Sequence, residues 1–269
     1  RAFPTLVAPS RDIGISLFGE LADGRVAYAT SLTNGVPDGL SGDSDTDHGK
    51  DVTGCVMVQA WGKQAAATRG LLTAGIAGSV GRARGTPGLP GLPSVDQVGF
   101  ETLLRFRSGV VSDGNRARLM PQATYYRGPF GMMAEYIRSF EDIALNDTRT
   151  KFRLSSWQIA GSWVLTGEKN SFQGVKPARP LVPGSGTWGA VELATRYQAI
   201  DVGSSVFPTF VDPTASVRSV KAWGLSANWY WNAFVKFVAD YEYARLEGGA
   251  PGGNRPAAHL FLGRMQFSL

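Results

Sequence analysis

Residues 222–243, AWGLSANWYWNAFVKFVADYEY, decide the fold, because two runs of alternating side chains flank a short connection. In the first run, Trp223 and Leu225 share one side and alternate with small or polar residues. In the second run, Phe237 and Tyr241 alternate with residues that include Lys, Asp and Glu. A period of two residues is typical of strands with two unlike faces. The stretch therefore predicts an antiparallel hairpin with one apolar and one polar face.

The same alternation recurs along the chain between short turn clusters. It predicts strands at about 13–21, 26–33, 52–60, 71–81, 97–107, 116–126, 130–140, 152–165, 188–200, 217–231, 233–245 and 257–269. Many of these segments have ten or more residues, whereas strands of soluble proteins average about five or six. About 9–11 residues cross a bilayer in a tilted barrel strand. The pattern predicts an all-β fold, an antiparallel transmembrane β-barrel of about twelve strands, and a soluble β-sandwich that binds ligands is the alternative.

Two details of the pattern bear on the barrel. Aromatic pairs such as Trp157 with Trp163 and Tyr241 with Tyr243 lie near expected strand ends, where membrane barrels carry aromatic girdles. Pro121 lies inside an expected strand of a barrel that has no edge, so we expect a local bulge there.

Composition excludes several other classes. No run of about 18 apolar residues occurs, so no transmembrane helix is predicted. The single cysteine excludes an intramolecular disulfide and a cysteine-rich metal site, and no cofactor is expected. The net charge of +5 comes from scattered Lys and Arg, which does not suggest nucleic-acid binding and weakly indicates a preference for anions.

Several motifs follow one another in a characteristic order. They are RDIG at 11–14, NGVPDG at 34–39, RLMPQ at 118–122, GPFG at 128–131, LTGEK at 165–169, GVKP at 174–177, WGAVELATRY at 188–197 and AWGLSANWY at 222–230. Together they resemble the phosphate-selective porin O and P family. The resemblance implies a 16-stranded barrel in the bacterial outer membrane, a homotrimer that conducts anions or small solutes, and a Pro at the position of Pro121.

The resemblance also bears on the extent of the domain. We expect residues 1–269 to be a single barrel domain that lacks its N-terminal strands, because about twelve of sixteen are predicted. The intact protein is expected to extend upstream of Arg1. The phosphate-binding residues of the family cannot be matched to positions of this chain, so the solute stays open.

Basic side chains on the polar faces are the candidate pore residues, because fixed cations lower the barrier for an anion. The pore-lining candidates are Arg105, Arg107, Arg118, Arg196, Lys236 and Arg264, and the pore-mouth candidates are Lys169, Lys176 and Arg179. The acids Glu20, Glu101, Glu135, Glu192 and Asp240 share the polar faces. For each pore-lining residue the alternative is an interior ion pair, such as Arg196 with Glu192, that only braces the wall. For the pore-mouth residues the alternative is a solvated loop with ordinary charges.

Other functions find less support in the sequence. Asp43, Asp45 and Asp47 suggest a calcium loop, but that template requires Gly and Glu where His48 and Gly54 stand. Neither His48 nor His259 has a nucleophile motif nearby, so no enzyme is predicted.

The hypothesis is a passive channel whose partners are outer-membrane lipid and small anionic or polar solutes. The rival is a non-conducting structural or adhesive barrel with a plugged lumen. The Gly- and Pro-rich residues 83–96 are the candidate for such a plug or, in a channel, for a constriction loop.

Overall fold

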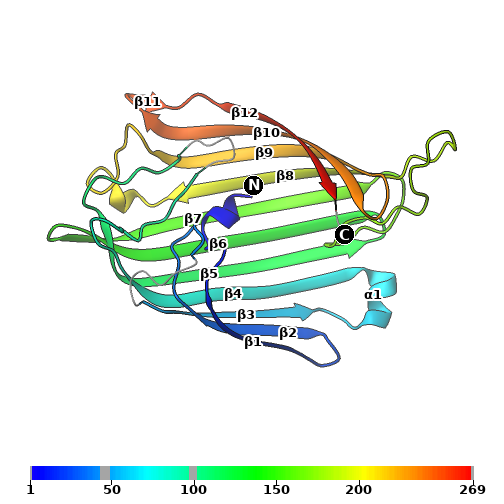
Figure 1. Cartoon of the computed structure of the whole chain (residues 1–269), viewed down its shortest axis with the longest axis horizontal. Helices are drawn as coiled ribbons and strands as arrows, with labels where there is room; N and C mark the ends of the chain where they lie inside the picture. Colours follow the sequence, from blue (N-terminus) through cyan, green and yellow to red (C-terminus); the bar gives the residue numbers. More distant parts are fainter. Residues whose placement is uncertain (1, 43–48, 97–101, 268–269) are drawn as a thin grey trace.

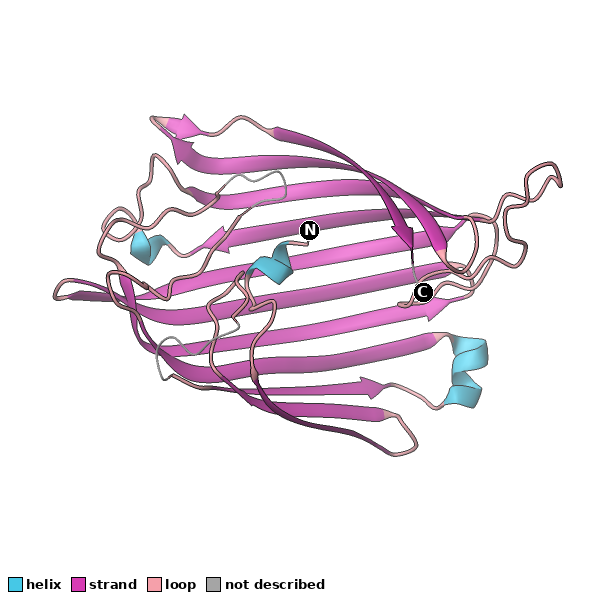
Figure 2. Cartoon of the chain, in the orientation of Figure 1, coloured by secondary structure: helices cyan, strands magenta, loops and turns pink. Residues whose placement is uncertain are grey.

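A computed structural model describes residues 2–42, 49–96 and 102–267. They form one antiparallel sheet of twelve strands with very little helix (Figures 1 and 2). The elements in chain order are η1 (Phe3–Leu6), β1 (Gly14–Leu21), β2 (Val26–Thr33), β3 (Asp51–Gln59), α1 (Lys63–Arg69), β4 (Leu71–Arg84), β5 (Val111–Arg127), β6 (Phe130–Leu145), β7 (Thr148–Val164), β8 (Ala190–Val202), η2 (Ser204–Val206), β9 (Val217–Tyr230), β10 (Val235–Ala250), β11 (Gly253–Asn254) and β12 (Ala258–Phe267).

Each strand pairs with the next one along the chain up to β10, which pairs with both β11 and β12. This meander confirms the all-β antiparallel prediction and the hairpin at 222–243, which is the β9–β10 pair. No described helix is long and apolar enough to cross a membrane.

Eleven of the twelve predicted strands are present, but the one predicted at 97–107 is wrong for its described part. Residues 102–107 belong to the connection between β4 and β5. Leu103 and Leu104 are adjacent and both buried, so side chains do not alternate there between two faces. The twelfth strand is instead β11, whose two residues are too few to show a period.

The bulge expected at Pro121 is also wrong. Pro121 pairs with Ile76 of β4. On the β6 side the ladder continues in the same register at Gln122, opposite Glu135. Proline lacks an N–H group, so it removes a hydrogen bond without displacing the strand. The register of β5 against β6 shifts instead between Ser112 and Arg116.

The two faces of the sheet differ as the alternation predicts. We call the face that carries η1 and the inward-folded connections the inner face, and the opposite one the outer face (Figure 1). The outer face exposes apolar side chains along every long strand, which suits contact with lipid. They include Ile15, Leu17, Leu32, Val56, Ile76, Val80, Met132, Ile159, Leu193, Leu225, Phe261 and Met265.

Aromatic side chains form two bands on the outer face. One band contains Phe130, Trp163, Trp229 and Phe237, near the ends of their strands. The other contains Trp157, Tyr197, Trp223, Tyr241 and Tyr243. The expectation that Trp157, Tyr241 and Tyr243 lie at strand ends is wrong, because β7 and β10 continue well beyond them.

The hydrophobic core lies on the inner face, at the end of the sheet where β4 ends and β5 begins. Three segments cover the strands there: the N-terminal segment with η1, the β4–β5 connection and the β8–β9 connection. Phe3, Leu103 and Phe210 supply large buried side chains from these three segments, and Phe152 supplies one from β7. One half of the inner face is therefore filled, and the other half is left to line a space.

Candidate functional site

The uncovered half of the inner face carries polar side chains and three hollows. The hollows have volumes of about 350, 630 and 790 Å³. The smallest shares Met133 and Ala160 with the second hollow, and Tyr126 with the third. They therefore form a row across the inner face, from β3 to β12, and this row is the candidate solute path.

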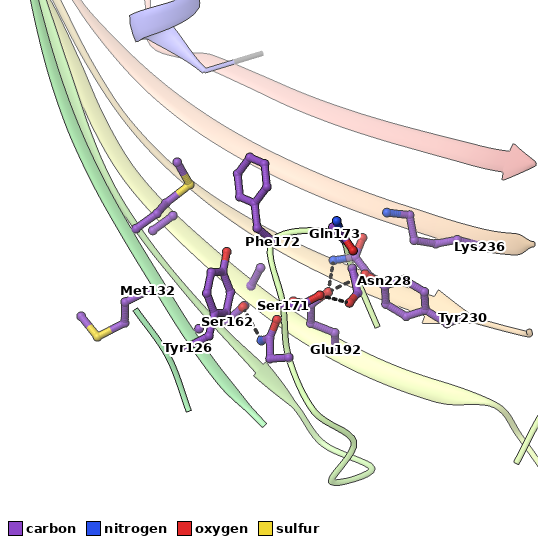
Figure 3. Close-up of a pocket in the computed structure, with 17 residues that line it drawn as sticks. Tyr126, Met132, Ser162, Ser171, Phe172, Gln173, Glu192, Asn228, Tyr230 and Lys236 are labelled. Atoms are coloured by element: carbon purple, nitrogen blue, oxygen red, sulfur yellow. Dashed lines mark hydrogen bonds between the residues drawn. The ribbon is translucent and has the colours of Figure 1, made fainter. Parts of the chain in front are cut away.

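The smallest hollow is built around Glu192 of β8 (Figure 3). One carboxylate oxygen of Glu192 accepts hydrogen bonds from the Tyr230 hydroxyl at 2.9 Å and from Asn228 Nδ2 at 3.2 Å. The ammonium group of Lys236 lies 5.2 Å from the centre of the Tyr230 ring, within the range of a cation–π contact. The wall of this hollow thus presents a fixed anion, an amide and a cation to a solute.

The β7–β8 connection folds back over the same hollow. Asn170 anchors it, because its Nδ2 donates to the Ser162 hydroxyl at 2.7 Å and its N–H donates to the Gly128 carbonyl at 2.8 Å. Phe172 and Gln173 follow and line the hollow (Figure 3). This short segment separates the smallest hollow from the largest one.

One acid of this connection has a shifted pKa. Partial burial alone would raise the pKa of Glu168, but hydrogen bonds from the Thr166 hydroxyl and the Ala178 N–H lower it below its ordinary value. Glu168 therefore stays ionised and ties the two arms of the connection together.

A buried ionic cluster lies on the inner face of β3 to β6. Arg118 Nε contacts Asp38 at 2.5 Å, and its Nη1 contacts Asp51 at 2.8 Å. Arg116 Nη2 lies 3.2 Å from Asp51, and its Nη1 lies 4.0 Å from Glu141. All five side chains are at most 5 % exposed. The cluster fixes residues 34–42 against the wall, because Arg116 and Arg118 also donate to the carbonyls of Gly35 and Val36.

A second network joins β8 to β10 and to the N-terminal segment. Glu242 Oε2 accepts hydrogen bonds from Arg196 at 2.8 Å and from Gln198 at 2.9 Å. Gln198 Oε1 in turn accepts the N–H of Phe3 at 2.8 Å. Arg196 therefore pairs with Glu242, and the pairing with Glu192 considered from sequence is not found.

The structure places four of the six pore-lining candidates on the inner face: Arg118, Arg196, Lys236 and Arg264. Arg118 and Arg196 are held in the ion pairs above. Within the described part of the chain, Lys236 and Arg264 form no ion pair, and they lie on adjacent strands, since Arg264 is opposite Val238.

Arg105 and Arg107 do not lie on a strand, so their assignment by alternation is wrong. Both are exposed in the β4–β5 connection, where Arg107 Nε donates to the Pro208 carbonyl at 2.9 Å. The pore-mouth candidates Lys169, Lys176 and Arg179 are exposed in the β7–β8 connection, at the opposite end of the strands.

Sequence analysis missed most of the buried cluster. Arg116 could have been found, because it shares a face of its strand with Arg118. Asp38 could not be assigned to a face in this way, because polar and apolar residues do not alternate in its segment. Of the acids, Glu20, Glu135, Glu192 and Asp240 lie on the inner face by register.

Five further candidates lie outside the described residues: Glu101, Asp43, Asp45, Asp47 and His48. His259 is on the outer face, with its Nδ1 2.9 Å from the Tyr241 hydroxyl. The described ranges contain no group of three His, Cys, Asp or Glu side chains that could hold a metal ion.

Comparison with known proteins identifies a family for this chain. A family model described as phosphate-selective porin O and P matches residues 103–269. That range covers β5 to β12 and both aromatic bands. A search of curated proteins finds no match.

Proposed function

Because the chain belongs to the phosphate-selective porin O and P family, we propose that it forms a passive diffusion channel for small polar solutes in the bacterial outer membrane, with a preference for anions. The lipid-exposed apolar side chains of the outer face support the membrane placement. The row of hollows on the inner face, whose linings include the charged side chains of Glu192, Lys236 and Arg264, supports the solute path. The channel needs no chemistry, only a wet lumen, a constriction and fixed charge.

The observation that carries the anion preference is the state of the four pore-lining candidates that lie on the inner face. Arg118 and Arg196 are neutralised by carboxylates at 2.5–2.8 Å. Lys236 and Arg264 lie beside two hollows and form no ion pair within the described ranges, and the acids Glu192 and Asp240 line the same two hollows. Cations in this state replace part of the hydration shell of a passing anion.

Phosphate and trimer assembly are finer parts of the proposal. The family description names phosphate, so phosphate is the anion to test first against chloride. We further propose a homotrimer and a sixteen-stranded closed barrel, in which the edge strands β1 and β12 gain partners. Closure is supported by the physics of the bilayer, where an unpaired strand edge is unfavourable.

The test is conduction by the native-length protein in planar bilayers under a KCl gradient. We expect discrete conductance steps whose reversal potential shows an anion preference. The K236Q/R264Q variant should keep the steps and lose most of that preference. R69Q, which removes one exposed charge at the end of α1, is the control and should match the unmodified protein. An unchanged reversal potential in the double variant would refute the role of these two cations.

The apolar core at one end of the inner face favours a second candidate, a plugged structural barrel. Residues 91–95 of the proposed plug fold onto the wall there, since the hydroxyl of Ser112 in β5 donates to the Gly91 carbonyl at 2.8 Å and Val95 is buried. Complete silence from folded, inserted protein would support this candidate and overturn the channel.

A further inference from the structure

Four cations lie on the outer face beside the second aromatic band. This basic belt consists of Arg138 of β6, Arg153 of β7, Lys221 of β9 and Arg245 of β10, and all four are exposed. Arg138 and Arg153 are diagonal neighbours, because Arg138 is opposite Ser155 in the β6–β7 ladder. None of the four points into the hollows of the inner face, so solute conduction does not explain them.

The belt contains an unfavourable contact within the protein itself. Lys221 and Arg245 are directly opposite each other in the β9–β10 ladder. Like charges at directly opposite positions destabilise a sheet. Two acids flank this pair: Glu247 lies 3.8 Å from Lys221, with both side chains more than half exposed, and Asp201 of β8 is diagonal to Lys221 because it is opposite Ser219. An anion from outside the protein would relieve the repulsion.

The position of the belt suits a lipid headgroup. Arg245 is two residues beyond Tyr243, and Lys221 is two residues beyond Trp223, a distance of about 7 Å along a strand. Trp and Tyr side chains of membrane proteins lie at the level of the headgroups. Arg245 also donates from Nε to the Tyr243 hydroxyl at 3.1 Å, which links the belt to the aromatic band.

The end of the strands at which the belt lies points to one leaflet. The connections from β2 to β3, from β4 to β5 and from β8 to β9 begin and end at this end of the strands, and the long connection from β7 to β8 begins and ends at the other. Longer loops mark the extracellular end of outer-membrane barrels. The belt therefore faces the outer leaflet.

We propose that the basic belt binds the phosphate groups of a phosphorylated outer-leaflet lipid of the lipid A type. This inference rests on the proposed membrane placement and is independent of whether the barrel conducts. The phosphates would bridge Lys221 and Arg245 and extend toward Arg153, while Trp223 and Tyr197 contact the acyl and sugar region. Arg is well suited to this role, because its guanidinium group binds phosphate through two parallel hydrogen bonds.

The test is binding of diphosphorylated lipid A to the folded native-length protein in neutral detergent. We expect K221Q/R245Q to bind about tenfold more weakly, since each basic residue near a membrane contributes to anionic-lipid affinity. R69Q/R127Q is the matched control, because it removes two exposed charges at the opposite end of the strands and should keep nearly the full affinity. Dephosphorylated lipid A and inorganic phosphate are run in parallel.

Each outcome decides the inference. Equal losses in both double variants would show non-specific attraction and overturn it, as would tight binding of dephosphorylated lipid A. Displacement of lipid A by low inorganic phosphate would assign the site to the free ion and overturn the lipid claim. Conductance of the same samples is recorded separately. A protein that binds lipid A and does not conduct would support this inference and contradict the proposed channel. A protein that conducts and does not bind lipid A would do the reverse.

Discussion

Replacing Arg118 with Met should destabilise the protein and loosen its inner wall. Arg118 is 5 % exposed and contacts Asp38, which is fully buried, and Asp51, which is 3 % exposed. Asp51 keeps Arg116 at 3.2 Å after the substitution, whereas Asp38 loses its ion-pair partner. Breaking a buried pair by removing one partner costs about 3–5 kcal/mol. Since one of the two acids stays paired, we expect the lower part of that range.

The effect is measured as the unfolding temperature of the folded protein in detergent. A change of 1 kcal/mol shifts the midpoint by about 2–4 °C for chains of this size, so R118M should unfold about 10 °C earlier. R127M makes the same replacement at an exposed position and should change the free energy of unfolding by less than about 0.5 kcal/mol.

A second variant tests whether the unpaired charge of Asp38 causes the loss of stability. In R118M/D38N the buried charge of Asp38 is also removed, so the double variant should be more stable than the sum of the two single changes predicts. In bilayers, R118M should show larger or noisier conductance, because residues 34–42 are no longer fixed to the wall. An R118M protein as stable as the unmodified one would refute the conclusion that the buried ionic cluster fixes residues 34–42 to the wall.

Three further predictions follow from other contacts. Glu242→Gln weakens the acceptor shared by Arg196 and Gln198 and should lower the free energy of unfolding by about 1–3 kcal/mol. The specific readout is faster hydrogen exchange at the Phe3 N–H, and the exposed Glu247→Gln is the control. Ile159→Arg puts a charge between the two aromatic bands and should destabilise the inserted barrel by about 2–4 kcal/mol, whereas Ile159→Leu should have little effect. Stability is measured by folding titrations with lipid vesicles, and an Ile159→Arg variant as stable as the unmodified protein would contradict the assignment of the outer face. The lowered pKa of Glu168 stabilises the β7–β8 connection at pH values above the ordinary glutamate pKa, and this contribution is lost as the pH falls through the lowered pKa; proteolysis of residues 165–189 should therefore increase in acid, and Glu168→Gln should remove that pH dependence.

Local alternation was sufficient to predict most of the sheet. A strand with one face in lipid and one in water repeats every two residues, so β8, β9 and β10 could be assigned face by face from sequence. The alternation is lost where adjacent side chains are both buried, as at Leu103 and Leu104. There the chain packs between the sheet and other connections, and no face is left to water.

The candidate site was less predictable, because its charge state depends on partners distant in sequence. Arg118 contacts Asp38, 80 residues away, and Asp51, 67 residues away. The order of the strands and the folding of a connection over the inner face bring these groups together. Sequence analysis placed Arg118 on the correct face and left open whether it was paired, and the structure shows the ion pairs.

The tight turns that join β5, β6 and β7 have a consequence for the order of folding. Gly128 and Pro129 connect the first pair, and Asn146 and Asp147 connect the second, so each hairpin closes over two residues. Asn146 has a φ of 53°, a backbone conformation that Asn adopts more readily than most residues. Closing a short loop loses little chain entropy, and contacts local in sequence form fastest. We therefore expect this three-strand unit to form early and the buried ionic cluster around Arg118 to form late, when Asp38 arrives from the β2–β3 connection and Asp51 from β3.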